Sequence, residues 1–345
     1  MRRWLVIICA AAAVITAAPF ANSEAASLLL GAGYWVDYDP NSLLTVSSQG
    51  SKLNWVIATQ FALAGTAGGV TGTHNADLMK AARQQGADVH FNVANYLNGG
   101  WNRDAVHSVL TRIDPRNRTI NAILGLLDKY GYDGVSLDFE NVAPQDRNAL
   151  TAFVVRLAGA VHGRGKVMTI AVPAKTRDDL TNDWNGAFDY TALGSAADAI
   201  IVMAYDEHWS TSEAGPIASE PWVDAVAQFA ASETDRSKIL LGVAFYGYAW
   251  PAKGTAEAVS MREAVDRAKR AGVTIQWDQT AKVPFYKLAG STVYFENARS
   301  VGRKMDLAKA RGLAGVAFWR LGHEVPGTWT TVAPYLQLNP TASAP

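Results

Sequence analysis

The run Asp-Gly-Val-Ser-Leu-Asp-Phe-Glu-Asn occupies residues 133–141 and places polar side chains at alternate positions of an apolar segment. Successive side chains of a β-strand point to opposite faces, so Ser136, Asp138 and Glu140 share one face and the apolar residues between them share the other. We expect the apolar face to pack against helices and the polar face to point into a barrel. Two carboxylates then enter the lumen near the carboxyl end of the strand, where barrel enzymes carry their chemistry.

Seven other β-rich segments are spaced along the chain, and longer helical patterns separate them. Most of these segments are nearly continuous apolar runs, which is typical of parallel strands buried on both faces. Eight such alternations over 345 residues predict the α/β class and a (β/α)8 TIM barrel. The predicted strands span residues 28–34, 55–61, 89–93, 134–139, 167–172, 199–205, 239–245 and 312–319, and the clearest helical patterns span 75–85, 120–130, 145–162, 222–231 and 298–311.

The connection between the last two predicted strands is about 65 residues long, far more than one helix needs. A helical pattern at 257–272, followed by short runs at 274–277, 284–287 and 292–295, predicts a small α+β insertion at about 251–297. We expect this insertion to form one wall of a groove at the active face. The barrel domain is expected to span residues 27–338, with a flexible tail at 339–345.

The composition is that of a well-packed globular protein, with 49% hydrophobic and 18% charged residues. Its 31 basic and 31 acidic residues give a formal net charge of zero. A neutral protein has no overall field that attracts polyanions, so we expect no nucleic-acid partner. The 11 Trp and 12 Tyr suit a neutral, flat ligand such as a sugar ring.

The N-terminus resembles a signal peptide over residues 1–26. Two arginines precede a short apolar run at 4–18, and small residues follow, with cleavage expected near Ala25 or Ala26. This pattern predicts a secreted or periplasmic protein without stable membrane insertion after signal removal, and an uncleaved anchor is the alternative. The single cysteine, Cys9, lies in the apolar run, so the mature protein is expected to have neither disulfides nor thiol chemistry.

The two inward carboxyls at 138 and 140 are separated by about 6.6 Å along the backbone, at ~3.3 Å per residue. In a partly dry site each charge makes the other harder to ionise, so one carboxyl should keep its proton near neutral pH. Such a pair supplies an acid and a stabilising anion. The alternative is that Asp133, Asp138 and Glu140 form salt bridges or cap the next helix, but acids that face inward are costly to bury without a use.

Four features make the sequence resemble glycoside hydrolase family 18, the chitinase-like family. Residues 133–140 match its Asp-Gly-x-x-x-Asp-x-Glu signature, residues 203–206 match its Met-x-Tyr-Asp element, and residues 242–247 resemble its seventh-strand segment. Trp319 ends the eighth predicted strand, as the tryptophan at the floor of the family's sugar subsite does. The order and spacing of these features agree over essentially the whole mature chain.

Within that family the sequence looks most like the branch of spore-cortex-lytic N-acetylglucosaminidases. The similar segments are Asp-Phe-Glu-Asn-Val at 138–142, Met-Ala-Tyr-Asp-Glu-His-Trp at 203–209, Phe-Tyr-Gly-Tyr at 245–248 and Gly-Val-Ala-Phe-Trp-Arg at 315–320. Two departures stand out. Ser136 occupies a position where the family's chitinases usually carry an aspartate, which leaves open how Asp138 is held and titrated. The cell-wall-binding repeats frequent in the branch are absent, which leaves a role in spores open.

The resemblance implies a retaining, substrate-assisted mechanism. Glu140 would protonate the glycosidic oxygen and later activate water, while the 2-acetamido carbonyl of the substrate attacks the anomeric carbon. Asp138 would accept the acetamide N–H and offset the developing positive charge, and the Tyr205 hydroxyl would orient the acetamide oxygen. These three residues are the catalytic candidates, and the route needs no cofactor.

Asp206, Trp319 and Tyr246 are the substrate-binding candidates that the resemblance implies. Asp206 would orient groups around Asp138, and Trp319 would offer an apolar plate beneath the sugar ring. Simple core packing is the alternative for the aromatic residues, including Tyr205, because aromatics at strand ends are often buried. Weaker candidates for a glycan groove are Tyr34, Trp35, Trp101, His208 and Trp209, whereas His90 and His162 are expected to be structural. The sequence has no His, Asp and Glu cluster with metal-ligand spacing.

The expected activity is therefore that of a glycosidase on polysaccharides or oligosaccharides containing N-acetylglucosamine, with peptidoglycan or its fragments as the leading substrate. Hydrolysis of chitin or chito-oligosaccharides by the same residues is the first alternative. The second is a barrel that binds glycans without cutting them, which the presence of Glu140 disfavours.

Overall fold

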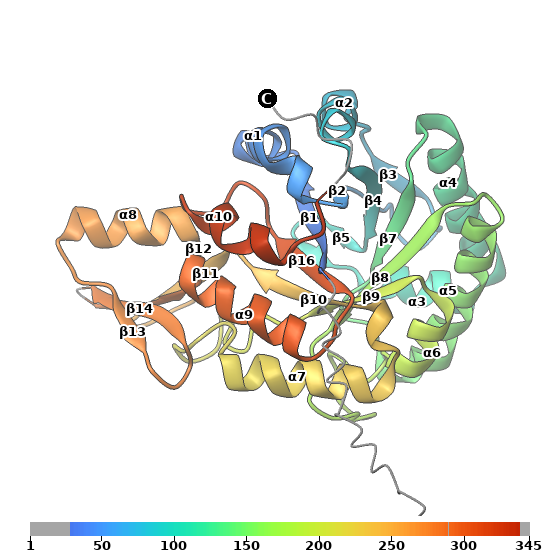
Figure 1. Cartoon of the computed structure of the whole chain (residues 1–345). Coiled ribbons are helices and arrows are strands. Elements are labelled where there is room, and N and C mark those ends of the chain that lie inside the picture. The colour runs from blue at the N-terminus through green and yellow to red at the C-terminus, as the bar shows by residue number, and fades with distance from the viewer. Residues whose placement is uncertain (1–27, 289, 339–345) are drawn as a thin grey trace, which may run out of the picture.

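The computed structural model describes residues 28–288 and 290–338. Eight parallel strands in these residues form a closed barrel, because the first strand pairs with both the second and the last (Figure 1). The predicted (β/α)8 class is confirmed, and each of the eight predicted strands is present within a few residues of its expected bounds. The barrel strands, in chain order, are β1 (Leu30–Val36), β2 (Trp55–Leu63), β4 (Asp88–Ala94), β7 (Gly134–Asp138), β8 (Val167–Pro173), β9 (Ala199–Met203), β10 (Ile239–Ala244) and β16 (Gly315–Trp319).

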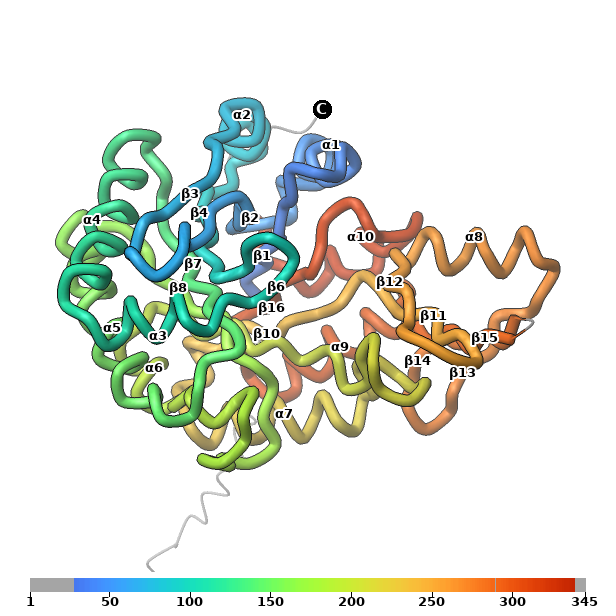
Figure 2. The backbone as a smooth tube through the Cα atoms, turned by 180° about the vertical axis from the view of Figure 1, so that it is seen from behind, coloured from blue at the N-terminus to red at the C-terminus, as the bar shows by residue number. Residues whose placement is uncertain are grey.

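Helices cover the outside of the barrel, and they lie around its rim in both views of the backbone (Figures 1 and 2). The five predicted helical segments all form, although one of them begins at Ile113 rather than 120, because Pro115 lies in the first turn, where proline is tolerated. Helices that the sequence analysis did not predict are short. The outer helices are α1 (Pro40–Gln49), α2 (Ala76–Gln84), α3 (Arg103–Thr111), α4 (Ile113–Tyr130), α5 (Arg147–His162), α6 (Tyr190–Ala196), α7 (Glu220–Glu233), α9 (Ala298–Ala310) and α10 (Thr328–Val332).

A small α+β unit between β10 and β16 stands beside the barrel in both views (Figures 1 and 2). Its five strands form a separate sheet with its own apolar core, in which Tyr286, Val293 and Phe295 are fully buried. The sheet begins at Tyr246, earlier than the expected start near 251, because the chain enters an antiparallel strand directly after β10. Its elements are β11 (Tyr246–Pro251), β12 (Glu257–Ser260), α8 (Met261–Ala271), β13 (Gln276–Asp278), β14 (Val283–Leu288) and β15 (Ser291–Phe295).

Two extra pairings modify the carboxyl ends of the second and third barrel strands. β3 (Val70–Gly72) adds an antiparallel strand to the end of β2. β5 (Tyr96–Leu97) and β6 (Gly100–Trp101) form a short hairpin where the chain leaves β4. This hairpin therefore lies next to the end of β7, the strand that carries the acidic residues.

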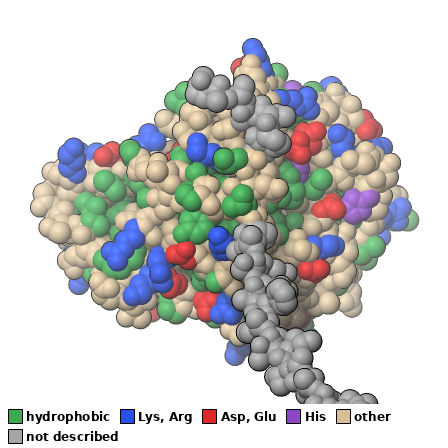
Figure 3. Space-filling view, in the orientation of Figure 1, with side chains coloured by type: hydrophobic (Ala, Val, Ile, Leu, Met, Phe, Trp, Pro, Cys, Tyr) green, Lys and Arg blue, Asp and Glu red, His purple; other side chains and the backbone are tan. Residues whose placement is uncertain are grey.

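The alternation within the strands separates an inner core from an outer one. Apolar side chains such as Ile57, Ile201 and Leu240 fill the lumen, together with the buried polar residues His90 and Asn92. Burying a polar side chain costs free energy unless it forms hydrogen bonds. The polar residues in the lumen are therefore candidates for a functional role. The outer surface carries charges of both signs scattered over the face in view (Figure 3), as expected for a chain with no net charge.

The expected signal peptide, including Cys9, and the expected tail at 339–345 lie outside the described residues. Within residues 28–288 and 290–338, no helix combines the length and apolar character needed to span a bilayer.

Candidate active site

The acidic strand β7 has the two-faced character that its sequence predicts. Leu137 and Phe139 are buried in the outer core, and the Phe139 ring stacks on Phe153 of α5 with centroids 5.8 Å apart. Ser136 and Asp138 lie on the opposite face, both buried. Asp138 is the last residue of β7 and Glu140 follows two residues later, so both carboxyls stand at the carboxyl end of the barrel.

Asp138 is held by one neighbour in the lumen. Its side chain is 7% exposed, and its Oδ2 accepts a hydrogen bond of 3.1 Å from Asn92 Nδ2 on the adjacent strand β4. Its Oδ1 accepts no hydrogen bond from any described residue. Burial raises the pKa of Asp138 to about 6, and the hydrogen bond from Asn92 opposes that rise. The carboxylate therefore has one fixed oxygen and one oxygen able to accept a bond from a ligand.

Glu140 is a carboxyl in a strongly anionic and mostly dry surrounding. Burial is the main reason that its pKa lies well above the usual value, and the charges of Asp138 and Asp206 raise it further. Three carboxyls thus share one region, and the ionisation of each hinders that of the others. A glutamate in this position keeps its proton to higher pH than an exposed one, which is the state needed to donate a proton near neutrality.

A group of tyrosines surrounds these carboxyls. Tyr205 follows β9, and burial is the main reason that its pKa is raised. The nearby groups raise the pKa further: Tyr34, Asp138, Glu140 and Asp206. The Tyr205 hydroxyl therefore stays protonated and able to donate. Burial is also the main reason that the pKa of Tyr34 is raised, and the charges of Asp138 and Glu140 raise it further, so Tyr34 lies at the same site.

Asp206 is fixed by the first strand of the α+β unit. Its backbone is in the left-handed region, with φ of 60°, at the turn after β9. The Tyr246 hydroxyl donates a hydrogen bond to Asp206 Oδ1, and the Tyr246 ring lies 6.0 Å from that of Tyr205. Burial raises the pKa of Asp206, and hydrogen bonds from Tyr246 and Tyr248 lower it. Tyr246 therefore links the added sheet to the acidic cluster.

Trp319 ends β16, next to β1 in the closed barrel. Its ring is half-buried and meets the buried Tyr34 ring edge to face, with centroids 5.1 Å apart. The six site residues predicted from the sequence, Asp138, Glu140, Tyr205, Asp206, Tyr246 and Trp319, thus stand at or just beyond the carboxyl ends of β7, β9, β10 and β16.

The weaker groove candidates divide into two sets. Trp209 is 50% exposed and Trp101 is half-buried beside Tyr96, with ring centroids 4.9 Å apart. His208 is also half-buried in the loop after β9. Trp35 was a wrong candidate, because it lies on the face of β1 opposite Tyr34 and is 2% exposed within the outer core.

The histidines expected to be structural lie away from the acids. His90 is fully buried in the lumen against Trp55, with ring centroids 4.8 Å apart, and burial lowers its pKa to about 4. His162 pairs with Asp198 at 2.9 Å on the outer surface. No group of three or more His, Cys, Asp or Glu side chains within residues 28–288 and 290–338 is placed to hold a metal ion.

Sequence reasoning missed Asn92 and Asn95, which touch the two acids directly. Asn92 bonds the Asp138 side chain, and the fully buried Asn95 bonds the backbone of Glu140 on both its N–H and its C=O, each at 2.8 Å. A signal was available, because His90 and Asn92 interrupt an apolar strand at alternate positions, as Ser136 and Asp138 do.

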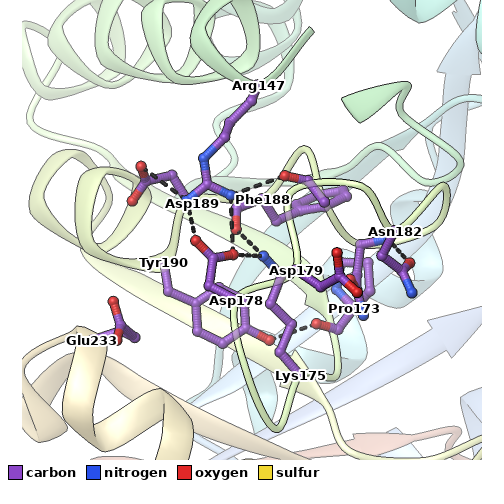
Figure 4. A network of polar contacts seen from close by, with 12 residues as sticks. Arg147, Pro173, Lys175, Asp178, Asp179, Asn182, Phe188, Asp189, Tyr190 and Glu233 are labelled. Carbon is purple, nitrogen blue, oxygen red and sulfur yellow. Dashed lines mark hydrogen bonds and ion pairs between the residues drawn. The ribbon is translucent and has the colours of Figure 1, made fainter. Parts of the chain in front are cut away.

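The loop after β8 is fixed by a polar network close to the carboxyl end of that strand (Figure 4). The buried Lys175 ammonium donates to Asp178 at 2.7 Å and to the Phe188 carbonyl at 2.6 Å. Arg147 of α5 pairs with Asp178 at 2.8 Å and with Asp189 at 3.1 Å. A cavity of about 210 Å³ lies against this network and is lined in part by Lys175, Asn185 and Trp222. The network joins the loop to α5 and stabilises this side of the barrel mouth.

Residues 32–324 match the model of the glycosyl hydrolases of family 18. The cortical fragment-lytic enzyme of Bacillus subtilis (strain 168) is 31% identical over 265 residues, which are 73% of this chain and 61% of that enzyme. The chain therefore spans less than two thirds of that relative's length.

Two solved structures are similar over most of the chain. The spore cortex-lytic enzyme SleL of Bacillus megaterium QM B1551 superposes with a TM-score of 0.82 at 26% identity, over 90% of this chain and 75% of that one. The chitinase of Chromobacterium violaceum ATCC 12472 superposes with a TM-score of 0.81 at 27% identity, over 88% of this chain and 98% of that one.

Proposed function

Because the chain belongs to the glycosyl hydrolases of family 18, we propose that it cleaves N-acetylglucosamine-containing glycans, with peptidoglycan or its fragments as the substrate. The observation that carries this proposal is the acidic pair at the barrel mouth. Glu140 has a pKa well above its usual value beside the buried Asp138, so one carboxyl can donate a proton while the other is able to act as an anion.

Glu140 is the general acid in this proposal. It protonates the oxygen of the scissile glycosidic bond, and the C1–O bond breaks as the carbonyl oxygen of the substrate's own 2-acetamido group attacks C1. The sugar whose C1–O bond breaks becomes an oxazolinium ion, and no carboxylate nucleophile is required. Glu140, now ionised, then takes a proton from a water molecule as the water oxygen attacks C1. The attack opens the oxazolinium ring and restores the acetamido group, with overall retention of configuration at C1.

Asp138 and Tyr205 act on the acetamide group. The Oδ1 of Asp138, which has no protein partner among the described residues, accepts the acetamide N–H, and its charge offsets the positive charge that develops on the ring. The protonated Tyr205 hydroxyl donates to the acetamide oxygen and holds it in line with C1. Both interactions strengthen as charge develops, so they favour the transition state over the bound substrate.

Asp206, Tyr246 and Trp319 bind and orient the sugar. Tyr246 fixes the Asp206 carboxylate at the edge of the acidic cluster. The half-buried Trp319 presents an apolar ring, which can pack against the C–H face of a pyranose.

The similar proteins favour peptidoglycan as the substrate in this proposal. The similar proteins include a cortical fragment-lytic enzyme and a spore cortex-lytic enzyme, whose names refer to the peptidoglycan layer of spores. A wall substrate fits the proposed export of the chain through its N-terminal segment, with action in the periplasm or outside the cell.

Chitin or chito-oligosaccharides are the second candidate. The Chromobacterium violaceum chitinase matches over nearly its whole length, and Chitinase A1 of Niallia circulans is 27% identical over 281 residues. The same acidic pair would act on either glycan, because both carry the 2-acetamido group that the mechanism uses.

The test is digestion of purified peptidoglycan sacculi and of chitin oligomers by the wild type and by Glu140→Gln. Products from sacculi alone support the peptidoglycan proposal, and products from chitin alone support the second candidate. If the wild type releases no products from either glycan yet binds them, the barrel is a glycan-binding protein and the hydrolase proposal is wrong. Normal turnover by Glu140→Gln contradicts the assignment of the acid.

A further inference from the structure

The backbone around Glu140 lies beyond the reach of the barrel's own strand pairing. The ladder between β4 and β7 ends with Ala94 opposite Asp138, and the ladder between β7 and β8 ends with Leu137 opposite Ile170. Glu140 follows both ladders, so its N–H and C=O find no strand partner there. A candidate acid on an unpaired backbone would be free to move, yet proton transfer needs its carboxyl at hydrogen-bond distance from the leaving oxygen.

The side chain of Asn95 supplies the missing pairing. Its Oδ1 accepts a hydrogen bond from the Glu140 N–H at 2.8 Å, and its Nδ2 donates to the Glu140 carbonyl at 2.8 Å. A primary amide offers one acceptor and one donor side by side, as a neighbouring strand would. Asn95 is fully buried, so water does not compete for either bond.

The same asparagine anchors the β5–β6 hairpin. The Asn95 carbonyl accepts from the Asn102 N–H at 2.9 Å, which closes the hairpin at its base. Directly after it, Arg103 donates to the Asn141 carbonyl at 3.0 Å and to Asn141 Oδ1. Asn95 before the hairpin and Arg103 shortly after it therefore hold two successive residues, Glu140 and Asn141.

We propose that Asn95 is the positioning residue for Glu140. Its side-chain amide takes the place of a neighbouring strand and fixes the direction from which the Glu140 side chain enters the barrel mouth. The inference deepens the proposed function, since it takes Glu140 as the acid. Asn95 touches no reacting atom in this proposal and acts on the acid through the backbone of residue 140. Its Nδ2 also makes a longer contact of 3.4 Å to the Asn102 carbonyl, which stays within the base of the hairpin.

The proposal predicts a loss in kcat rather than in binding for Asn95→Ala. A small displacement of a reacting group lowers the rate by roughly ten- to a hundredfold, whereas the groups that bind the sugar stay in place. We expect kcat to fall within that range and KM to change less than about threefold. Asn54→Ala is the matched control, because Asn54 also accepts from a backbone N–H, that of Gly31 at 2.9 Å, at the opposite end of the barrel. The control should keep the wild-type kcat.

Asn95→Asp provides a rescue that a merely structural role would not show. A protonated aspartic acid offers one C=O acceptor and one O–H donor, so it can make both bonds to the Glu140 peptide. The ionised form has no donor and repels the carbonyl. The ratio of kcat for Asn95→Asp to kcat for the wild type should therefore rise toward one as the pH falls. A ratio that does not change with pH overturns the proposal, as does a wild-type kcat in Asn95→Ala.

A measurement without turnover separates this inference from the proposed function. The side-chain carboxyl of Glu140 can be titrated by NMR in protein labelled with ¹³C-glutamate, with its signal assigned by its absence in Glu140→Gln. Release of the backbone in Asn95→Ala should let the carboxyl move toward water and away from Asp138 and Asp206, so its pKa should fall. An unchanged pKa in Asn95→Ala overturns the positioning role even if no glycan is cleaved. If the pKa falls in Asn95→Ala and the wild type cleaves neither glycan, only the proposed function is contradicted.

Discussion

Asn92 on β4 and Asp138 on β7 face each other inside the barrel, and a hydrogen bond of 3.1 Å from Asn92 Nδ2 holds only one of the two aspartate oxygens. The bond favours the ionised form of Asp138, whereas burial favours the protonated form and raises its pKa to about 6. The balance between these two effects keeps the carboxylate available near neutral pH. The consequences can be measured in the pH dependence of the reaction.

The wild-type enzyme is predicted to have a bell-shaped profile of kcat/KM against pH. As the pH falls through about 6, Asp138 takes a proton and can no longer offset positive charge, so activity is lost on the acid side. On the alkaline side, activity is lost as Glu140 gives up the proton it must donate, at a pH well above the usual range for glutamate. The two limbs belong to the coupled pair of carboxyls. Initial rates on a soluble oligosaccharide over pH 4 to 10 would measure them, and a profile without an acid limb contradicts the role of ionised Asp138.

Asn92→Ala should move the acid limb of that profile to higher pH. The substitution removes the hydrogen bond that lowers the pKa of Asp138, so the carboxylate takes a proton earlier as the pH falls. Thr169→Val is the control, because Thr169 is a buried barrel residue whose hydroxyl has no hydrogen-bond partner among the described residues. Its profile should match that of the wild type. An acid limb that stays in place in Asn92→Ala shows that the limb does not report Asp138.

Asp138→Asn should lower kcat by about a hundred- to a thousandfold, since in the proposed mechanism the charge of Asp138 stabilises the transition state. KM should change much less, because the amide still occupies the same space. The variant should also lower the pKa of Glu140, which the Asp138 charge raises, so the alkaline limb should move to lower pH. Residual activity is measured at high enzyme concentration. A variant with wild-type kcat would remove Asp138 from the mechanism.

Tyr246→Phe should raise the pKa of Asp206 and reduce kcat/KM by about tenfold, because the Asp206 carboxylate loses a hydrogen-bond donor. The matched control is Tyr335→Phe, which removes a hydroxyl that donates to Asp306 at 2.7 Å on the exposed surface. The control should leave kcat/KM unchanged. Equal losses in the two variants would mean that the effect of Tyr246 is one of general stability.

The barrel could be predicted from the sequence because strand periodicity and burial act locally. Strands such as β7 and β10 are marked by continuous apolar runs, and the polar residues of β7 are set off by alternation. Helices such as α1 escaped prediction because only three of its ten residues are buried, which leaves little apolar periodicity. The strand β11 escaped because Tyr246 continues the apolar run of β10, and only the fold shows that the chain changes sheets there.

The candidate site could be predicted where side chains alternate on one strand, but not where they meet across strands. Asp138 and Glu140 stand on the same segment, so spacing alone brings them together. Asn95 and Glu140 are 45 positions apart, and their contact depends on the point at which β4 leaves the ladder. Trp35 was misjudged for a related reason. Neighbouring side chains on β1 point to opposite faces, so Tyr34 faces the lumen and Trp35, one residue later, is buried in the outer core.

A buried ion pair joins the α+β unit to the barrel. Glu296, directly after β15, and Lys304 on α9 form bonds of 2.8 and 2.9 Å, and both side chains are almost completely buried. Lys304→Met should lower the free energy of unfolding by about 3–5 kcal/mol, because it leaves an unpaired charge in the interior. The loss should shrink as the pH falls, since burial already raises the pKa of Glu296 and removal of the lysine raises it further, so the carboxyl takes a proton.

Two further variants test the origin of that loss. Arg303→Met breaks the neighbouring exposed pair with Glu220 and should cost less than about 1 kcal/mol, because water already solvates those charges. The double variant Glu296→Leu/Lys304→Met removes both buried charges and should recover most of the stability lost in Lys304→Met. Urea unfolding followed by tryptophan fluorescence measures all three. A double variant as unstable as Lys304→Met would show that the lysine stabilises the junction by packing rather than by its charge.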